Sequence, residues 1–261
     1  MIRARETKPF FFGDQEVLVS HPVGTQENYG AILTDRKSIF GYESSLSHII
    51  QRNIDNRSLF LDIGAQIGLF SIHAALLGAD VISFEMRPSV VHCHFETKAA
   101  NQISNWLPLP YAVGEALAQI PISDDAQFVL VGDKTASFQP EGLVTCIPID
   151  TLNLHQTNKE RPTFVKMDIE GFEVFALRGM REFVQALRPT LAIECHPHAA
   201  WAYGASIQEI RSLLPPEYVL QFCATHRHES DIGSLEELPG ELPILDNYMI
   251  MASPAERAVK F

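Results

Sequence analysis

An acidic residue and two glycines follow a buried apolar run and indicate a ligand-binding turn. The stretch SLFLDIGAQIGLFS, residues 58–71, contains Asp62, Gly64 and Gly68. The apolar run predicts a buried strand, and the spacing of apolar residues beyond Gly68 predicts a helix. In open α/β sheets, ligands bind where such a strand leads into a helix, because the helix N-terminus presents N–H groups and glycine lets the backbone come close. An ordinary turn without a ligand is the alternative.

Asp62 narrows the kind of ligand that this turn suits. The dinucleotide-binding fingerprint has glycine where this sequence has Asp62. A carboxylate is unfavourable beside a pyrophosphate but suits a ligand with a positive group and no phosphate. S-adenosylmethionine, with its ammonium, sulfonium, ribose and adenine, is such a ligand. Glu85 ends the second predicted strand, where an acid can accept hydrogen bonds from two ribose hydroxyls.

A second group of charged residues lies in residues 164–173, FVKMDIEGFE. Lys166, Asp168 and Glu170 alternate with apolar residues and therefore share one face of an extended segment. Charges at the end of an apolar strand are costly unless they are paired or used. A helix N-terminus favours acids, which explains Glu173 and in part Glu170, but it does not explain Asp168.

A third group, Glu194-Cys195-His196, follows the fifth predicted strand. If the strands are neighbours, Asp168, Glu194 and His196 converge at the carboxyl edge of the sheet. Two carboxylates and an imidazole can hold a divalent cation such as Mg²⁺. They can equally supply a general base. Both interpretations stay open at this point.

Two pairs of histidines stand apart from these groups. His92/His94 and His226/His228 both have i, i+2 spacing. On a helix, this spacing points the two rings of a pair away from each other. We therefore expect both pairs on the surface, with little part in function.

The elements that must position these groups alternate between strand and helix. This alternation is typical of a mainly parallel sheet with helices on both faces. We expect residues 1–57 to form a strand-and-helix extension that covers the cofactor site, and residues 58–261 to form the main domain, with an irregular excursion of short strands at 115–148. The predicted strands of the main domain are residues 59–63, 80–84, 107–113, 163–167, 190–194, 218–224 and 248–252, and the predicted helices are 67–77, 89–101, 172–187 and 206–214.

The composition favours a globular chain that acts on a small molecule. The 261 residues are 46% hydrophobic and 20% charged, with a formal net charge of −12. An acidic chain without a run of Lys or Arg is a poor binder of nucleic acid and of anionic membranes. Its first residues do not resemble a secretory signal, and no apolar run is long enough to span a bilayer. Four scattered cysteines fit a reduced, cytoplasmic chain, and a homo-oligomer stays open.

Taken together, these segments resemble the FkbM family of S-adenosylmethionine-dependent methyltransferases, over about residues 40–200. The segment at 164–180 matches the spacing K-x-D-x-E-G-x-E-x-x-x-L-x-G and is the most specific part, whereas most class I methyltransferases share the first motif. Family members often have Glu-Pro after the second strand, and this chain has Glu85-Met86-Arg87-Pro88 instead. The segments that carry the resemblance are FLDIGAQIGLFSIHAALLGADVISFE (60–85), AVGE (112–115), FVKMDIEGFEVFALRGM (164–180) and LAIECHP (191–197).

The resemblance implies a Rossmann-like class I methyltransferase fold with seven strands in the order 3-2-1-4-5-7-6, strand 7 being antiparallel. It also implies that the first turn and the ends of neighbouring strands bind the cofactor. The residues expected beside S-adenosylmethionine are Asp62, Gly64, Ala65, Gln66, Gly68, Glu85, Met86, Val113 and Asp168.

The family is mostly associated with O-methylation, so the resemblance implies methyl transfer to a hydroxyl of a small metabolite or sugar, in secondary metabolism. We expect Asp168 to assist the nucleophile, directly or through a divalent cation held with Glu194 and His196, which are the secondary catalytic candidates. N-methylation of a small molecule or peptide is the alternative. A nicotinamide-dependent oxidoreductase is a further alternative, which Asp62 disfavours. A non-catalytic cofactor-binding domain is another, which the strand-end acids disfavour.

Overall fold

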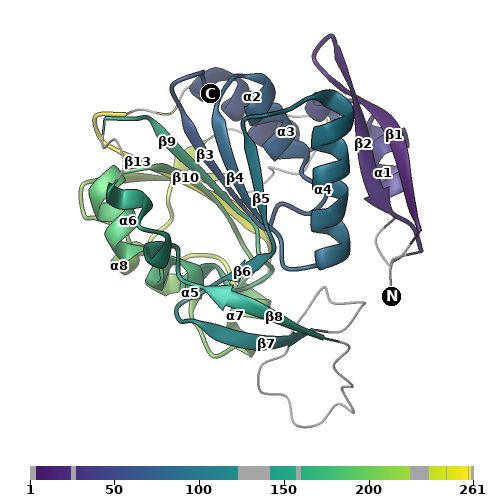
Figure 1. Ribbon diagram of the computed structural model, residues 1–261. Helices are drawn as coiled ribbons and strands as arrows, with labels where there is room; N and C mark the ends of the chain where they lie inside the picture. Colours follow the sequence, from purple (N-terminus) through teal and green to yellow (C-terminus); the bar gives the residue numbers. More distant parts are fainter. Residues whose placement is uncertain are drawn as a thin grey trace.

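One mixed sheet runs through the centre of the molecule (Figure 1). The structure, a computed structural model, describes residues 4–24, 28–122, 142–156, 160–223, 235–244, 246–257 and 259. The sheet has eight strands in the order β12-β11-β13-β10-β9-β3-β4-β5. Their bounds are β3 (Leu59–Ile63), β4 (Asp80–Phe84), β5 (Trp106–Leu109), β9 (Thr163–Met167), β10 (Thr190–Cys195), β11 (Tyr218–Cys223), β12 (Glu236–Glu237) and β13 (Tyr248–Pro254).

The strand order confirms the predicted α/β class. The five strands from β5 to β10 are parallel to their neighbours, whereas β13 is antiparallel to both β10 and β11. Strands β5, β4, β3, β9, β10, β13 and β11 hold the places 3-2-1-4-5-7-6. The expected count of seven is wrong by one, because the two-residue strand β12 pairs with the outer edge of β11.

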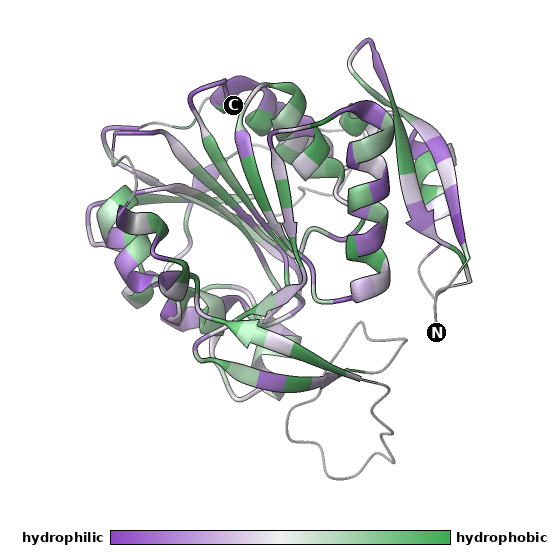
Figure 2. Ribbon diagram, in the orientation of Figure 1, coloured by the Kyte–Doolittle hydropathy of each residue, from purple (hydrophilic) through white to green (hydrophobic). Residues whose placement is uncertain are grey.

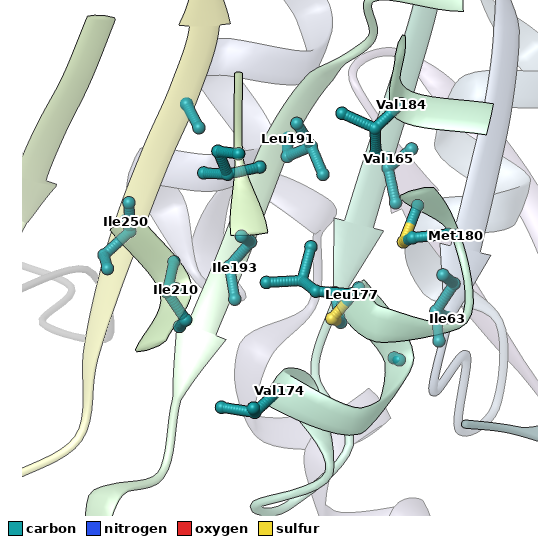
Figure 3. Close-up of a cluster of buried hydrophobic side chains, with 14 of the residues drawn as sticks. Ile63, Val165, Val174, Leu177, Met180, Val184, Leu191, Ile193, Ile210 and Ile250 are labelled. Carbon is teal, nitrogen blue, oxygen red and sulfur yellow. The ribbon is translucent and has the colours of Figure 1, made fainter. Parts of the chain in front are cut away.

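The central strands are buried on both faces, which explains why their sequences are continuous apolar runs. Along β3, Leu61 and Ile63 point into one hydrophobic cluster, while Phe60 points into the other, as alternate side chains of a strand do. Figure 3 shows part of the first cluster, in which Ile63 shares the space with Leu177 and Met180. This packing holds β3 and β9 side by side, so the charged residues that follow them meet at one edge.

Helices cover both faces of the sheet, and apolar residues concentrate in the strands and on the inward helix faces (Figure 2). None of the helices in the described part of the chain has the length and apolar character needed to cross a bilayer. One face carries α2 (Ser44–Asn53), α3 (Leu69–Leu76) and α4 (Pro88–Asn101), the other α5 (Glu173–Arg178), α6 (Arg181–Leu187) and α8 (Ile210–Leu213), and α7 (Pro197–Ala202) follows β10. The short 3₁₀ helices are Ile39–Gly41, Ile149–Leu152, Leu154–Gln156 and Ile207–Glu209.

The N-terminal residues form a hairpin beside α4, and a helix packs against this hairpin. Strands β1 (Arg5–Phe12) and β2 (Gln15–Pro22) are antiparallel and precede α1 (Tyr29–Arg36). The Leu18 N–H donates to Asn101 Oδ1 and the Ser20 N–H to Thr97 Oγ1, both at 2.9 Å. These bonds fasten the hairpin to the outer side of α4 (Figure 1). The idea that residues 1–57 cover the cofactor site stays a prediction.

Two predicted elements are each divided in the structure. The predicted strand at 107–113 is β5 followed by β6 (Tyr111–Val113), because Pro110 between them has no N–H for the ladder. The predicted helix at 172–187 is α5 followed by α6, with a break at Gly179, whose added Cβ would lie 2.0 Å from the Gly114 carbonyl oxygen.

The excursion expected at 115–148 contains short strands at both of its ends. Strand β7 (Ala118–Ile122) pairs with β8 (Gly142–Ile147), and β8 also pairs with β6 to make a separate three-stranded sheet. Residues 123–141 lie outside the described part of the chain, as do His226 and His228.

Candidate active site

The turn after β3, residues 62–68, is in direct contact with the end of β9, and we call it the glycine turn. Gly64 has a φ of +80°, and a Cβ added there would lie 1.8 Å from the Asp168 carbonyl oxygen. The N–H groups of Gly64 and Ala65 both donate to the Phe84 carbonyl at 3.0 Å. Glycine is needed here both for its left-handed conformation and for the close approach of two backbones. The glycine turn therefore brings the carboxyl ends of β3, β4 and β9 together.

Left-handed residues other than glycine gather at this edge of the sheet. Seven described residues of this kind have positive φ, and four of them, Lys37, Gln102, Asn153 and Arg188, end helices. This is a common place for such a conformation. The other three are Glu43, Gln66 and Glu170. They flank the site from three different segments, and strain of this kind concentrates at functional sites.

Glu85, the predicted ribose ligand, lies at the end of β4 with its side chain 5% exposed. Its Oε2 accepts the Gln66 N–H at 3.0 Å. Arg87 donates to Oε1 from its backbone N–H and its Nε, both at 2.9 Å. Burial opposes ionisation, but the Arg87 guanidinium outweighs it and lowers the pKa of Glu85. Arg87 is one of the two residues that separate Glu85 from Pro88, where family members often have Glu-Pro. It therefore holds a charged Glu85 in place.

Asp62 is fully buried at the end of β3. Its Oδ2 accepts a hydrogen bond from Ser71 Oγ at 2.6 Å. Its Oδ1 makes no hydrogen bond to any residue of the described ranges and lies 3.7 Å from Lys166 Nζ. Burial raises the pKa of Asp62, while Lys166 acts in the opposite direction.

Lys166 joins the first two groups of charged residues. It is the neighbour of Asp62 in the β3–β9 ladder, and its Nζ donates to the Gly64 carbonyl at 3.1 Å. The same Nζ lies 3.6 Å from Asp168 Oδ2. Burial alone would lower the pKa of Lys166, but Asp168 and Asp62 raise it above its usual value. Lys166 is thus a buried cation shared by two carboxylates.

Four carboxylates surround the buried His196, and we call this group the acid cluster: Asp168, Glu170, Glu173, Glu194 and His196. The His196 Nδ1 lies 2.9 Å from Glu173 Oε1. Its Nε2 lies 3.4–3.7 Å from oxygens of the other three acids. Although burial opposes the charge, the contact with Glu173 and the neighbouring acids raise the pKa of His196 to about 11. His196 is therefore an imidazolium at neutral pH.

Glu173 has a role beyond the one expected from the sequence. The helix dipole predicted an acid at the start of a helix, and Glu173 is the first residue of α5. The side chain is nevertheless fully buried, where Oε1 accepts the Gly171 N–H at 3.0 Å and contacts His196. It orients the imidazole from behind, so it belongs to the acid cluster rather than to the surface.

Asp168, Glu194 and His196 fit a cation site as well as a proton-transfer site. One ligand atom from each of the three lies within 4.8 Å of the others. In metal-bound histidines, the ring nitrogen that does not bind the metal usually donates to a carboxylate, and His196 Nδ1 has such a contact with Glu173. Its Nε2 faces Asp168 and Glu194. Because His196 is protonated when no cation is present, a cation would have to displace that proton.

Tyr42 and Glu43, which precede α2, reach the same site from the N-terminal segment. The ring centroids of Tyr42 and Phe70 lie 5.8 Å apart, and Lys166 Nζ lies 5.7 Å from the Phe70 centroid. Burial, and then the charges of Glu43 and Asp168, raise the pKa of Tyr42. The sequence motifs gave no signal for these two residues, because they lie 20 positions before Asp62 and Ile63.

A cavity lies between the glycine turn, the end of β4 and the end of β9. Of the residues expected at the cofactor, six line it: Gly64, Gln66, Glu85, Met86, Val113 and Asp168. Asp62, Ala65 and Gly68 lie behind this lining, as do the catalytic candidates Glu194 and His196. The further lining residues, which were not among those expected at the cofactor, are Ile63, Phe84, Arg87, Tyr111, Ala112, Ile120, Ile169, Glu170, Phe172 and Tyr203.

The expectation of a surface position is wrong for one of the helical histidines. His92 is exposed, but His94 on α4 is fully buried, and its Nε2 lies 2.6 Å from the Gln66 carbonyl oxygen. Their i, i+2 spacing does point the two rings apart, and for this reason the His94 ring faces inward to the glycine turn.

Known proteins resemble the chain in the same region. A family model described as the methyltransferase FkbM domain matches residues 62–223. A comparison with curated proteins finds no match. Among solved structures, the chain is similar to methyltransferase FkbM from Methylobacillus flagellatus KT, with 19% sequence identity and a TM-score of 0.46. That alignment covers 76% of this chain but only 44% of the other protein, so the chain spans less than half of its length.

Two further solved structures are similar over most of both chains. SMU.1697c from Streptococcus mutans, solved in complex with SAH, shares 12% identity over 81% of this chain and 97% of that one, with a TM-score of 0.47. A TehB-like SAM-dependent methyltransferase from Corynebacterium glutamicum shares 10% identity over 87% of this chain and 94% of that one, with a TM-score of 0.44. Because the family model covers more than half of the sequence and includes both the glycine turn and the acid cluster, the chain belongs to the methyltransferase FkbM domain family.

Proposed function

We propose that the protein transfers the methyl group of S-adenosylmethionine to a hydroxyl of a small acceptor, such as a metabolite or sugar. The observation that carries this proposal is that Gly64, Glu85 and Asp168 line one cavity. A cofactor on the glycine turn would therefore lie next to a carboxylate that can take a proton. Membership of a methyltransferase family supports the same reaction.

The residues of the cofactor side fit a cationic nucleoside. Asp62 Oδ1, a buried acceptor without a hydrogen bond to the described residues, lies behind the cavity lining and adds negative charge that favours a cationic ligand. Glu85 has the place of a ribose ligand, provided that Arg87 yields one of its contacts. Met86 and Val113 supply apolar surface beside it. When bound, S-adenosylmethionine supplies the electrophilic methyl group on its sulfonium.

Asp168 is the group that we propose to bind and deprotonate the acceptor. It lines the cavity, and its side chain is 20% exposed. Lys166 and His196 lie 3.6 and 3.7 Å from its oxygens, so two cationic side chains face this carboxylate. Asp168 would orient the acceptor hydroxyl and accept its proton as the oxygen attacks. Glu194 and His196, which do not line the cavity, would act by positioning Asp168.

The charges of the site favour a neutral or positive acceptor. Asp62, Lys166 and the acid cluster together have five carboxylates and two cations. This excess of negative charge repels phosphate and nucleic acid. It also suits a protonated amine, so N-methylation is the second candidate, in which Asp168 would remove the amine proton.

A divalent cation such as Mg²⁺ is an additional part of the proposal. Asp168, Glu194 and His196 would hold it, and it would polarise the acceptor oxygen. Chelator should then abolish methyl transfer, and added Mg²⁺ should restore it. Full activity in chelator would reject the cation and leave the role of Asp168 as a base intact.

We further propose that residues 1–57 are an extension of the main domain and form its acceptor side. Tyr42 and Glu43 support this, because the charge of Asp168 acts on the Tyr42 hydroxyl and the charge of Glu43 acts on Lys166. Tyr42→Phe should change acceptor turnover by several-fold and leave binding of S-adenosylhomocysteine unchanged, as measured by calorimetry. An effect on cofactor binding alone would place Tyr42 on the cofactor side.

The test of the reaction is product mass. The protein is incubated with trideuteromethyl S-adenosylmethionine and pools of hydroxylated or amine-bearing metabolites. A methyl group added to one acceptor, with a mass shift of about 17 Da for the labelled transfer, is expected. Binding of NADH but not of S-adenosylhomocysteine in calorimetry would instead indicate an oxidoreductase. Binding of S-adenosylhomocysteine without any product would indicate a non-catalytic cofactor-binding domain.

A further inference from the structure

The peptide groups of Gln66 are held at both ends by side chains from two other elements. The Gln66 N–H donates to Glu85 Oε2 at 3.0 Å, from the end of β4. The Gln66 carbonyl lies 2.6 Å from the Nε2 of His94, which comes from α4. Gln66 itself has a φ of +52°, which an L residue adopts only at some cost. The two side chains thus hold a left-handed residue in the middle of the glycine turn.

The hydrogen bond from His94 has one possible direction. A carbonyl oxygen can only accept, so Nε2 carries the proton, and because burial lowers the pKa of His94 to about 4, the ring is neutral and Nδ1 carries none. The His94 ring is fully buried, and its centroid lies 5.0 Å from that of Trp106. An added Cβ at Gly68 would lie 2.7 Å from the Trp106 ring and 3.3 Å from His94 Cδ2. The ring is therefore enclosed between Trp106 and the glycine turn, with its donor fixed on the Gln66 carbonyl.

From this geometry we propose that His94 is a positioning residue for cofactor binding. By donating to the Gln66 carbonyl, it holds Gln66 in the left-handed conformation in which the Gln66 N–H meets Glu85. The inference rests on the proposed function, because it takes the glycine turn as the cofactor site. His94 does not line the cavity, so its effect on the ligand passes through Gln66 and Glu85, which do.

The alternative is that His94 is a core histidine that only fills space. The chain contains a second buried histidine that allows this alternative to be tested. His73 on α3 is also buried, but its Nε2 lies 3.0 Å from Gln51 Oε1 on α2, away from the glycine turn. A substitution at His73 removes a similar ring and a similar hydrogen bond. It is therefore the control for the general loss of packing at His94.

The experiment compares three variants of the full chain, His94→Asn, His94→Gln and His73→Asn. The amide nitrogen of glutamine reaches about as far as Nε2 of histidine, whereas that of asparagine stops near Nδ1. We expect His94→Asn to raise the Kd for S-adenosylhomocysteine about tenfold, the effect of one lost bond to a buried carbonyl. His94→Gln should stay within about threefold of the wild type, and His73→Asn should lower Tm without changing Kd.

Two results would overturn the proposal. One is equal Kd for His94→Asn and the wild type, and the other is equal weakening by His94→Asn and His94→Gln. A measurement on the unmodified protein covers the case in which the variants do not fold. Nitrogen-15 NMR should find His94 protonated at Nε2, and protonation at Nδ1 alone would reject the bond. If the wild type itself does not bind S-adenosylhomocysteine, the proposed function fails along with the inference, whereas wild-type binding with unaffected variants fails the inference alone.

Discussion

The glycine turn and the acid cluster lie at the same edge of one sheet, but they depend on different kinds of interaction. The glycine turn is made of backbone groups in close contact, and Glu85, which accepts the Gln66 N–H, is paired with Arg87. The acid cluster is made of side chains, with four carboxylates around one imidazolium. A buried histidine lies in contact with the glycine turn and another lies within the acid cluster, and their pKa values are shifted in opposite directions: the pKa of His94 is lowered to about 4, and that of His196 is raised to about 11.

The two regions should therefore be sensitive to different kinds of substitution. A region held by backbone contact is sensitive to added volume and insensitive to loss of distant charge. A region held by charge is sensitive to neutralisation even when the shape of the side chain is kept. Four predictions test this division.

Added volume should be most damaging at Gly64. Gly64→Ala places a Cβ 1.8 Å from the Asp168 carbonyl oxygen, so the turn and β9 must separate. We expect the Kd for S-adenosylhomocysteine to rise by roughly 100-fold or more, since positioning errors of about 1 Å cost that much. Gly13→Ala is the control, because Gly13 has a φ of +64° and no atom within 4 Å of the added Cβ. It should cost only about 1 kcal/mol of stability. Normal binding by Gly64→Ala would refute the account of the glycine turn.

Loss of charge should be most damaging at Glu173. Glu173→Gln keeps the shape but removes the charge that faces His196. We expect the free energy of unfolding to fall by about 3–5 kcal/mol, as for other broken buried pairs, and the pKa of His196 to fall. Urea denaturation and NMR titration measure the two effects. Glu217→Gln, at the exposed partner of Arg188, should leave the free energy of unfolding almost unchanged. Equal costs at Glu173 and Glu217 would show that the cluster is not held by charge.

Asp168 belongs to both regions and should separate binding from chemistry. Asp168→Asn should lower methyl transfer by roughly 100-fold or more, the effect of losing a general base, with little change in the Kd for S-adenosylhomocysteine. The assay is the mass shift of the acceptor. Glu170→Gln, in the same cluster but with a side chain 46% exposed, should lose less than about tenfold. Equal losses of binding and turnover in Asp168→Asn would contradict the proposed role.

His94 and His196 should give the free energy of unfolding a maximum between an acid and an alkaline limb. The pKa of His94, like that of His73, is lowered to about 4 by burial. The unfolded chain therefore takes up protons first, and each histidine costs about 2 kcal/mol of stability between pH 7 and pH 5. His196 has the opposite sign, because its raised pKa stabilises the folded chain below about pH 6.5 and this contribution is lost as the pH rises towards 11.

Urea denaturation between pH 5 and pH 9 checks both limbs. His73→Asn should remove about half of the acid limb that the two low-pKa histidines cause. Glu173→Gln should flatten the alkaline limb, because it removes the main partner of His196. An acid limb that is unchanged in variants of both low-pKa histidines would contradict their buried neutral state.

The order of strands and helices and the position of the main charged groups could be predicted from the sequence. A strand buried on both faces needs a continuous apolar run, and a close turn needs glycine, so local patterns carry this information. The charged groups at the ends of β3, β4, β9 and β10 followed from the rule that parallel strands end at one edge. The edge strand β12 and the division of residues 172–187 into two helices did not follow, because both depend on contacts between distant segments.

Which polar residues support the site from behind depends on the tertiary structure. The motifs gave no signal for Glu43, His94 was expected on the surface, and Glu173 was expected at a helix start. In the structure, the charge of Glu43 acts on Lys166, and His94 and Glu173 are buried against groups on other elements. A local pattern records whether a side chain can face outward, whereas its partner is set by packing between elements far apart in the chain. For His94, that partner is a backbone carbonyl, which every residue has and no sequence pattern can mark.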